Sequence, residues 1–173
     1  MPIARPSTDE FAPYYGTYVN AVTGGDALAA LVSQREGSER FLRGIPEARA
    51  GYRYAPEKWS IREVVGHVSD AERIFCYRML RIGRGDETPL SSFDENAYVP
   101  TGGFDRRPLA DVAAELAAVR DATLALARNL DETALLRVGT ASGKRVSARA
   151  LAWIIAGHEA HHIRVLRERY LER

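Results

Sequence analysis

The chain has 173 residues, of which 46% are hydrophobic and 27% are charged, and its formal net charge is +1. These values are typical of a soluble globular protein, and the balanced charge gives no electrostatic reason to expect nucleic acid or a membrane as a partner. We expect a single domain over residues 1–173 in the cytoplasm, with an arm over 1–24 and a helical bundle over 25–171. Cys76 is the only cysteine, which excludes an intrachain disulfide.

The first segments predict an arm followed by a helix. Residues 1–24 are rich in Pro, Tyr and Gly, which favours an extended arm. Asp26 is a candidate N-cap for a helix that ends near Gly44 and Pro46.

A second helix and a long connection follow. Ser60 and Glu63 form a capping-box pattern for a helix that runs to about Ile82. Residues 83–108 predict a long, irregular connection, and loops of this length are often functional. We expect its residues Asp94, Asn96 and Tyr98 to form the wall of a substrate pocket, although a merely packed connection remains the alternative.

Two further helices complete the pattern. Pro108 starts an Ala- and Leu-rich helix that runs to about Leu130, and Ser147 is a candidate cap for a helix that runs to about Tyr170. No convincing pair of strands is present in the sequence. We therefore predict an all-α protein, a four-helix bundle with an N-terminal arm and a long connection between helices two and three.

The histidines are clustered in the last helix. The chain has four, and three of them are His158, His161 and His162. Counting about 100° per residue places His158 and His162 in the middle of the apolar stripe, and His161 at its edge. Two inward imidazoles one turn apart are well spaced to share a metal ion. His67, on the second helix, lies roughly 95° from the centre of its stripe, so angle counting leaves its direction open.

Two glutamates are weak candidates for a catalytic role. Glu72 lies near the middle of an apolar stripe, where it is a metal ligand, a partner for a histidine nitrogen, or half of a salt bridge. Glu159 lies at the margin of its stripe and is either a partner for the site or solvated. The run from His158 to His162 also matches the H-E-x-x-H signature of zinc proteases. Only eleven residues follow it, and Val165 and Glu168 occupy the positions of the glycine and the third histidine of the extended signature, so we do not expect a protease.

The run Lys58-Trp59-Ser60-Ile61-Arg62-Glu63, with His67 after it, and the run His158-Glu159-Ala160-His161-His162 together resemble the DinB superfamily, in particular its YfiT-like metal-binding branch. The resemblance covers nearly the whole chain after the arm. It implies an up-down-down-up bundle in which His67, His158 and His162 bind a divalent metal, with His161 as a bystander. It also implies a homodimer. Asp94 joins Glu72 and Glu159 as a weak catalytic candidate, because the segment from Phe93 to Tyr98 looks familial.

The resemblance leaves the reaction open. Imidazole ligands suit zinc and nickel first, and iron or another metal as well. We expect a metal-dependent transferase that joins a low-molecular-weight thiol cosubstrate, such as bacillithiol or mycothiol, to a small electrophilic substrate. A metal-dependent hydrolase with the same ligands is the first alternative. A non-catalytic dimeric bundle with a vestigial metal site is the second.

Overall fold

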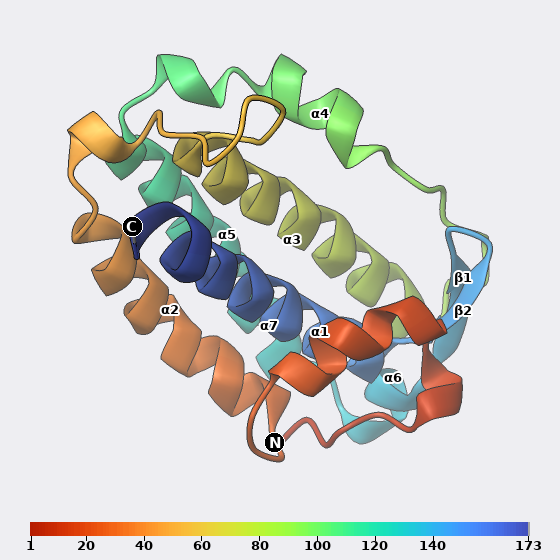
Figure 1. Cartoon of the computed structure of the whole chain (residues 1–173). Helices are drawn as coiled ribbons and strands as arrows, with labels where there is room; N and C mark the ends of the chain where they lie inside the picture. The colour runs from red at the N-terminus through yellow and green to blue at the C-terminus, as the bar shows by residue number, and fades with distance from the viewer. Residues whose placement is uncertain (173) are drawn as a thin grey trace.

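The computed structural model describes residues 1–172 and consists mainly of helices (Figure 1). α2 and α3 each pack against both α5 and α7, so the four long helices form a bundle. α3 and α5 run in the same direction, and α2 and α7 run in the opposite one, which confirms the predicted up-down-down-up four-helix bundle (Figure 1). The bounds of these helices are α2 Ala27–Arg43, α3 Ile61–Gly83, α5 Leu109–Arg128 and α7 Ala148–Val165, which a π-helical turn over Leu166–Leu171 extends.

Each long helix begins where its cap residue predicts. The side chains of Asp26, Ser60 and Ser147 each accept a hydrogen bond from a backbone N–H in the first turn of the helix that follows, at 2.9, 3.1 and 3.0 Å. Pro108 immediately precedes α5. The three capping side chains satisfy N–H groups that have no partner inside their own helix, and Pro108 presets the backbone where α5 starts, so local sequence fixes the start of each helix.

The expected extended arm is wrong in part, because much of it is helical. It contains 3₁₀ turns over Thr8–Glu10 and Pro13–Tyr15, and then α1, Gly16–Ala21. The arm packs on α7 through α1 and through its first residues. The indole Nε1–H of Trp153 donates to the carbonyl oxygens of Ile3 at 3.1 Å and of the next residue at 3.0 Å.

A glycine lets α1 lie directly on α7. A Cβ atom at Gly157 would lie 1.9 Å from the carbonyl oxygen of Tyr18, far closer than real atoms approach. Only a residue without a side chain permits this contact. Because Gly157 immediately precedes His158, the contact places the arm over the first of the clustered histidines.

The connection after α3 is also more regular than predicted. It contains α4, Glu95–Gly102, and a 3₁₀ turn over Phe104–Arg106. The helix escapes sequence prediction because Pro100 lies inside it. The connection returns along α3, where Phe104 fills the space that a side chain at Gly66 would occupy: a Cβ there would lie 2.3 Å from the ring.

The expectation of no strand pair is wrong. Val138–Ala141 (β1) and Lys144–Ser147 (β2) form an antiparallel hairpin after the short helix α6, Glu132–Leu136. Its turn requires positive φ at Ser142 (53°) and Gly143 (70°). Backbone hydrogen bonds of 2.9 Å join this hairpin to Leu90 in the connection. The strands are only four residues long, which explains why the sequence pattern missed them.

The apolar core is divided by a polar layer. One cluster of buried apolar residues includes Phe75 of α3 and Trp153 of α7, and the other includes Val64 of α3 and Leu166 beyond α7. Between these clusters, α3, α5 and α7 carry the buried polar residues His67, Glu72, Arg120, His158 and Glu159. No helix within residues 1–172 is long and apolar enough to cross a membrane.

Candidate metal centre

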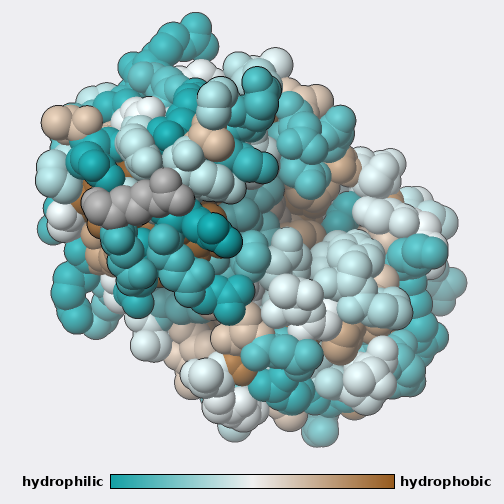
Figure 2. Space-filling view, viewed as in Figure 1, coloured by the Kyte–Doolittle hydropathy of each residue, from teal (hydrophilic) through white to brown (hydrophobic). Residues whose placement is uncertain are grey.

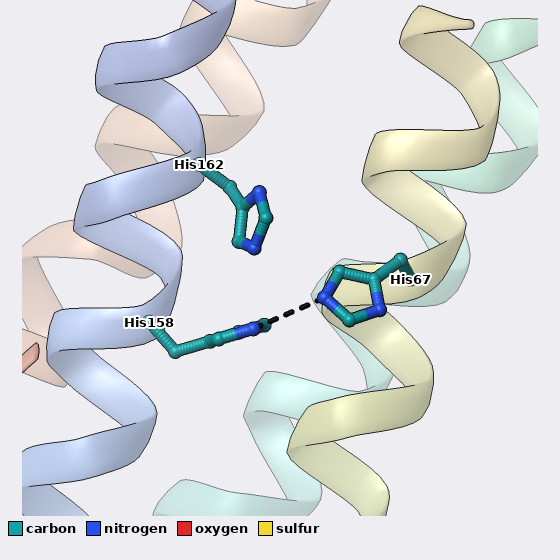
Figure 3. A group of neighbouring side chains, drawn as sticks. All are labelled: His67, His158 and His162. Atoms are coloured by element: carbon teal, nitrogen blue, oxygen red, sulfur yellow. Dashed lines mark hydrogen bonds between the residues drawn. The ribbon is translucent and has the colours of Figure 1, made fainter. Parts of the chain in front are cut away.

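Three histidines meet between α3 and α7. His158 and His162 extend from successive turns of α7 toward His67 on α3 (Figure 3). The Nε2 atoms of His67 and His158 lie 3.1 Å apart. Each of the three rings offers one nitrogen, and these nitrogens all lie within 4.8 Å of one another. The packing of α3 on α7 thus gives His67 the inward direction that angle counting left open.

The three imidazoles are held in their neutral form. His67 and His158 are buried, and His162 is largely buried. Burial lowers the pKa of His67 to about 4, and it lowers the pKa of His162 to about 3 with the help of the neighbouring imidazoles. Burial also lowers the pKa of His158 well below its usual value. A neutral imidazole has a free lone pair, which is the form that binds a metal ion.

This donor set fits a divalent cation. Zinc–imidazole bonds of about 2.0–2.1 Å place two nitrogens of one tetrahedral site roughly 3.3 Å apart. One pair of nitrogens here is 3.1 Å apart and none of the three is more than 4.8 Å from another, so small side-chain rotations would bring them to that spacing. Three neutral histidines leave coordination positions open, as catalytic zinc sites do.

His161 lies outside this group. Its ring packs against Tyr18, with ring centroids 5.7 Å apart, and the Nη2 of Arg164 lies 3.4 Å from its Nδ1. Among the described residues, the group that can share a metal contains the other three histidines. His161 is therefore a natural control for experiments on the cluster.

The two glutamates belong to a second buried cluster, held by Arg120. Its guanidinium donates from Nε and Nη2 to the two carboxylate oxygens of Glu72, at 2.8 Å each. The same Nη2 contacts Glu159. Glu72 thus forms the predicted salt bridge. The alternative that Glu159 is solvated is wrong, because its side chain is only 3% exposed.

Sequence reasoning missed Arg120. Burial alone would lower the pKa of this guanidinium, but Glu159 and Glu72 outweigh burial and raise it. The signal was present in the sequence, because Arg120 follows Leu116 by one helical turn on an Ala- and Leu-rich helix. An arginine on such a stripe needs a buried acid as its partner.

Asp94 has a structural role in the connection. Its side chain accepts a hydrogen bond from the backbone N–H of Asn96 at 2.9 Å and caps α4. The side chain of Tyr98 packs against Phe93, with ring centroids 5.7 Å apart. Of the three residues expected in a pocket wall, the structure places Asn96 against a cavity beside His162.

Two cavities reach the histidines. The first, the Trp59 cavity, has a volume of about 340 Å³ and ends at His162. The second, the Arg78 cavity, has a volume of about 170 Å³ and ends at His67 and His158. Their further lining residues include Tyr54, Lys58, Trp59 and Asn96 for the first, and Tyr18, Phe75, Arg78 and Glu95 for the second.

The start of α4 stands between these cavities, because Glu95 lines one and Asn96 lines the other. Figure 2 shows that this face of the molecule is mostly hydrophilic and is hollowed near its middle, in the region between α4 and α1. Aromatic rings border the histidines: Trp59 lies 4.8 Å from His67, and Tyr18 lies 5.2 Å from His158, between ring centroids. Small molecules thus have two routes to a site whose walls are largely aromatic.

Fold and site together define a helical bundle with a buried three-histidine cluster. The chain matches the family model of the DinB superfamily over residues 30–166, and it belongs to that superfamily. A search of curated protein sequences finds no match.

Solved structures share the fold. YfiT from Bacillus subtilis, described as a probable metal-dependent hydrolase with an unusual four-helix bundle topology, superposes with a TM-score of 0.71 at 16% identity, over 94% of this chain and 89% of that one. The mycothiol-dependent maleylpyruvate isomerase gives a TM-score of 0.63 at 21% identity, over 79% of this chain and 58% of that one. A histidine-to-alanine mutant of the isomerase gives 0.62 at 20% identity over the same shares.

Proposed function

We propose that the chain is a divalent-metal-dependent enzyme that transfers a low-molecular-weight thiol to a small electrophile. Zinc and nickel are the metals we expect first, and iron is a further candidate. The observation that carries the proposal is the convergence of His67, His158 and His162, two of them buried and the third largely buried, at the end of two cavities.

A bound cation would supply Lewis acidity that lowers the pKa of a thiol or of water beside it. The residues around it hold the imidazoles in place and exclude bulk water. Trp59 and Tyr18 pack their rings against His67 and His158. The two cavities offer separate positions for a thiol and an electrophile, which supports a reaction with two substrates.

The buried carboxylates favour thiol transfer over hydrolysis. Activation of water by a histidine-bound metal is commonly assisted by a glutamate that acts as general base. Glu72 and Glu159 are both held by Arg120, so neither is free to accept a proton from water. A thiol has a pKa near 8.5 and loses its proton far more easily than water does. Deprotonation of a thiol therefore needs less assistance from this site than deprotonation of water.

Hydrolysis is the second candidate, and Glu95 is the observation that favours it. Its carboxylate lines the Arg78 cavity together with His67 and His158, where it would serve as a general base. The likeness to YfiT, named as a probable metal-dependent hydrolase, points the same way. A Glu95→Gln variant discriminates between the two candidates: hydrolysis would lose at least about tenfold in rate, whereas thiol transfer would continue.

The metal site is tested first. Protein purified without a histidine tag is loaded with zinc, dialysed and analysed for metal content, alongside His67→Ala, His158→Ala and His162→Ala. We expect one metal ion per unchanged chain and a loss of stoichiometric binding in each variant. His161→Ala is the matched control and should retain its metal. Full occupancy in the three variants would show that the ligand assignment is wrong.

The reaction is tested second. Metal-loaded protein is incubated with the generic electrophile 1-chloro-2,4-dinitrobenzene, with and without bacillithiol, mycothiol or cysteine, and the thioether product is measured. Thiol-dependent turnover that disappears in His158→Ala supports the transferase. Ester or amide hydrolysis without added thiol would support the hydrolase instead.

A third candidate from the sequence, a non-catalytic dimeric bundle with a vestigial metal site, predicts neither activity. The homodimer and the cytoplasmic location stay predictions. Sedimentation equilibrium of the purified chain tests the first of these.

A further inference from the structure

We propose that the Arg78 cavity binds the carboxylate of a small electrophilic substrate, with Arg78 as its anchor. This inference names the substrate class for the proposed function and rests on it. The electrophile would occupy the cavity that ends at His67 and His158, and the Trp59 cavity would remain for the thiol.

One face of α3 builds the floor of this cavity. His67, Ala71, Phe75 and Arg78 follow one another at intervals of four, four and three residues, and all four line the cavity. Residues at these spacings lie on one side of a helix. A molecule that extends along this face would contact the histidine cluster at one end and the guanidinium of Arg78 at the other.

Arg78 is buried without an acidic partner. The residue is 2% exposed, yet none of the ion pairs within residues 1–172 includes it. Its Nη2 donates to the carbonyl oxygen of Ser91 at 2.7 Å and to the hydroxyl of Ser142 at 3.0 Å. The guanidinium also interacts with the hydroxyl of Tyr15 and with the rings of Phe75 and Phe93, none of which carries a negative charge. A buried charge is costly unless it is paired, so this guanidinium lacks an anion.

Arg120 shows what the fold does when a buried arginine is purely structural. That guanidinium is fully paired by Glu72 and Glu159. The protein offers Arg78 only uncharged hydrogen-bond acceptors, and Arg78 lines a cavity. The free N–H groups of a guanidinium match the two oxygens of a carboxylate.

The size and walls of the cavity select the rest of the ligand. Its volume of about 170 Å³ is close to that of an engineered cavity of about 150 Å³ that takes a benzene ring. The rings of Phe75 and Phe93 lie 5.9 and 5.8 Å from the guanidinium carbon. A substrate of benzoate size would therefore fill the space with its apolar part against these rings.

Charge also favours an anion. Glu95 is the carboxylate that lines the cavity, and it partly offsets Arg78. A divalent cation on the histidines would leave positive charge in excess. Tyr18 lines the same cavity, and its phenol can donate a hydrogen bond to a carboxylate.

The hairpin orients Arg78. The turn between β1 and β2 places the hydroxyl of Ser142 where it accepts a hydrogen bond from Nη2 of Arg78 at 3.0 Å. Because this acceptor is uncharged, it orients the guanidinium without neutralising it.

Calorimetric titration with benzoate and with its uncharged analogue benzamide tests the inference. In zinc-loaded protein we expect one benzoate per chain, bound at least about tenfold more tightly than benzamide. Arg78→Met should lower the affinity for benzoate by about tenfold or more and leave the affinity for benzamide unchanged. Equal affinities for the two probes in the unchanged protein would overturn the inference.

Control variants separate binding from structure. Arg73→Met removes an exposed arginine of the same helix and should leave benzoate affinity unchanged. Ser142→Ala removes the tie between Arg78 and the hairpin and should lower thermal stability, while most of the benzoate affinity remains. If Arg78→Met does not fold, Arg78→Lys decides, because it retains the charge but loses the paired donors. We expect it to bind benzoate about three- to tenfold more weakly.

The outcomes distinguish this inference from the proposed function. Zinc content is measured on the same samples. Bound zinc with benzoate affinity that does not depend on Arg78 would overturn the carboxylate site and leave the metal enzyme standing. Benzoate binding that depends on Arg78 in protein that takes up no zinc would support the carboxylate site and overturn the proposed metal function.

Discussion

Two buried polar clusters adjoin at His158 and Glu159 of α7, and they satisfy their polar atoms in opposite ways. Arg120, Glu72 and Glu159 pair opposite charges and need nothing from outside the chain. His67, His158 and His162 are neutral, and their nitrogens face one another. The first cluster is complete as it stands, whereas the second needs a ligand. The comparison teaches that burial of polar groups marks a binding site only where the protein does not supply the partners.

The largest effect should come from breaking the paired cluster. Arg120→Met leaves two buried carboxylates without a partner, and we expect the free energy of unfolding to fall by about 3–5 kcal/mol. Urea denaturation followed by circular dichroism measures this change. Adding Glu72→Gln and Glu159→Gln to the same chain should restore much of the loss. A fall of less than about 1 kcal/mol in the free energy of unfolding of Arg120→Met would show that the fold does not depend on pairing these charges.

Removing the metal should act on the other cluster alone. At a free zinc concentration one hundred times the dissociation constant, binding stabilises the folded state by about 2.7 kcal/mol. A chelator should therefore lower the melting temperature of the unchanged protein. His158→Ala should show no such shift, whereas His161→Ala should shift as the unchanged protein does. An identical shift in His158→Ala would place the metal elsewhere.

A change at Gly157 should reach the histidines through the arm. Because a Cβ there would meet the backbone of Tyr18, we expect Gly157→Ala to destabilise the fold by about 1–3 kcal/mol and to weaken metal binding. Gly37→Ala in α2 is the control, since no atom lies within 4 Å of its added methyl group. That control should be neutral or slightly stabilising, by up to about 1 kcal/mol. Unchanged stability in Gly157→Ala would mean that α1 does not pack on α7 as described.

Protonation of the metal-free cluster should destabilise the fold gradually as the pH falls. The folded-state pKa values of His67 (about 4) and His162 (about 3) lie below the usual 6.5. As pH falls below 6.5 the unfolded chain binds protons that the folded chain does not, so stability falls. The slope is up to about 1.4 kcal/mol per pH unit for each imidazole. Urea midpoints at pH 7.0, 6.0 and 5.0 measure it, and replacing His67 with Gln should reduce the slope.

A flat profile between pH 7 and 5 in metal-free protein would show that the imidazoles are not held neutral. His161→Ala is again the control. Burial and the neighbouring Arg164 lower the pKa of His161 as well, but its ring is less buried than that of His67, so its loss should change the slope less than the loss of His67 does.

The sequence by itself determined the four long helices and the inward direction of two histidines. Caps such as Ser60 and Ser147 act within one turn, and the spacing of His158 and His162 is a property of a single helix. Local chemistry therefore decided these features before any packing was known. The all-α bundle followed from the periodicity of the helices.

Only the tertiary structure decided what depends on contacts between distant segments. His67 lies at the edge of its own helical stripe, and the packing of α3 on α7 brings it to His158. The partners of Glu72 and Arg120 lie on different helices. The helical turns of the arm lie in a segment that packs on α7. The helix α4 and the two strands of the hairpin are too short to give a clear sequence pattern. No local rule could specify these pairs, because their energies arise only when the helices meet.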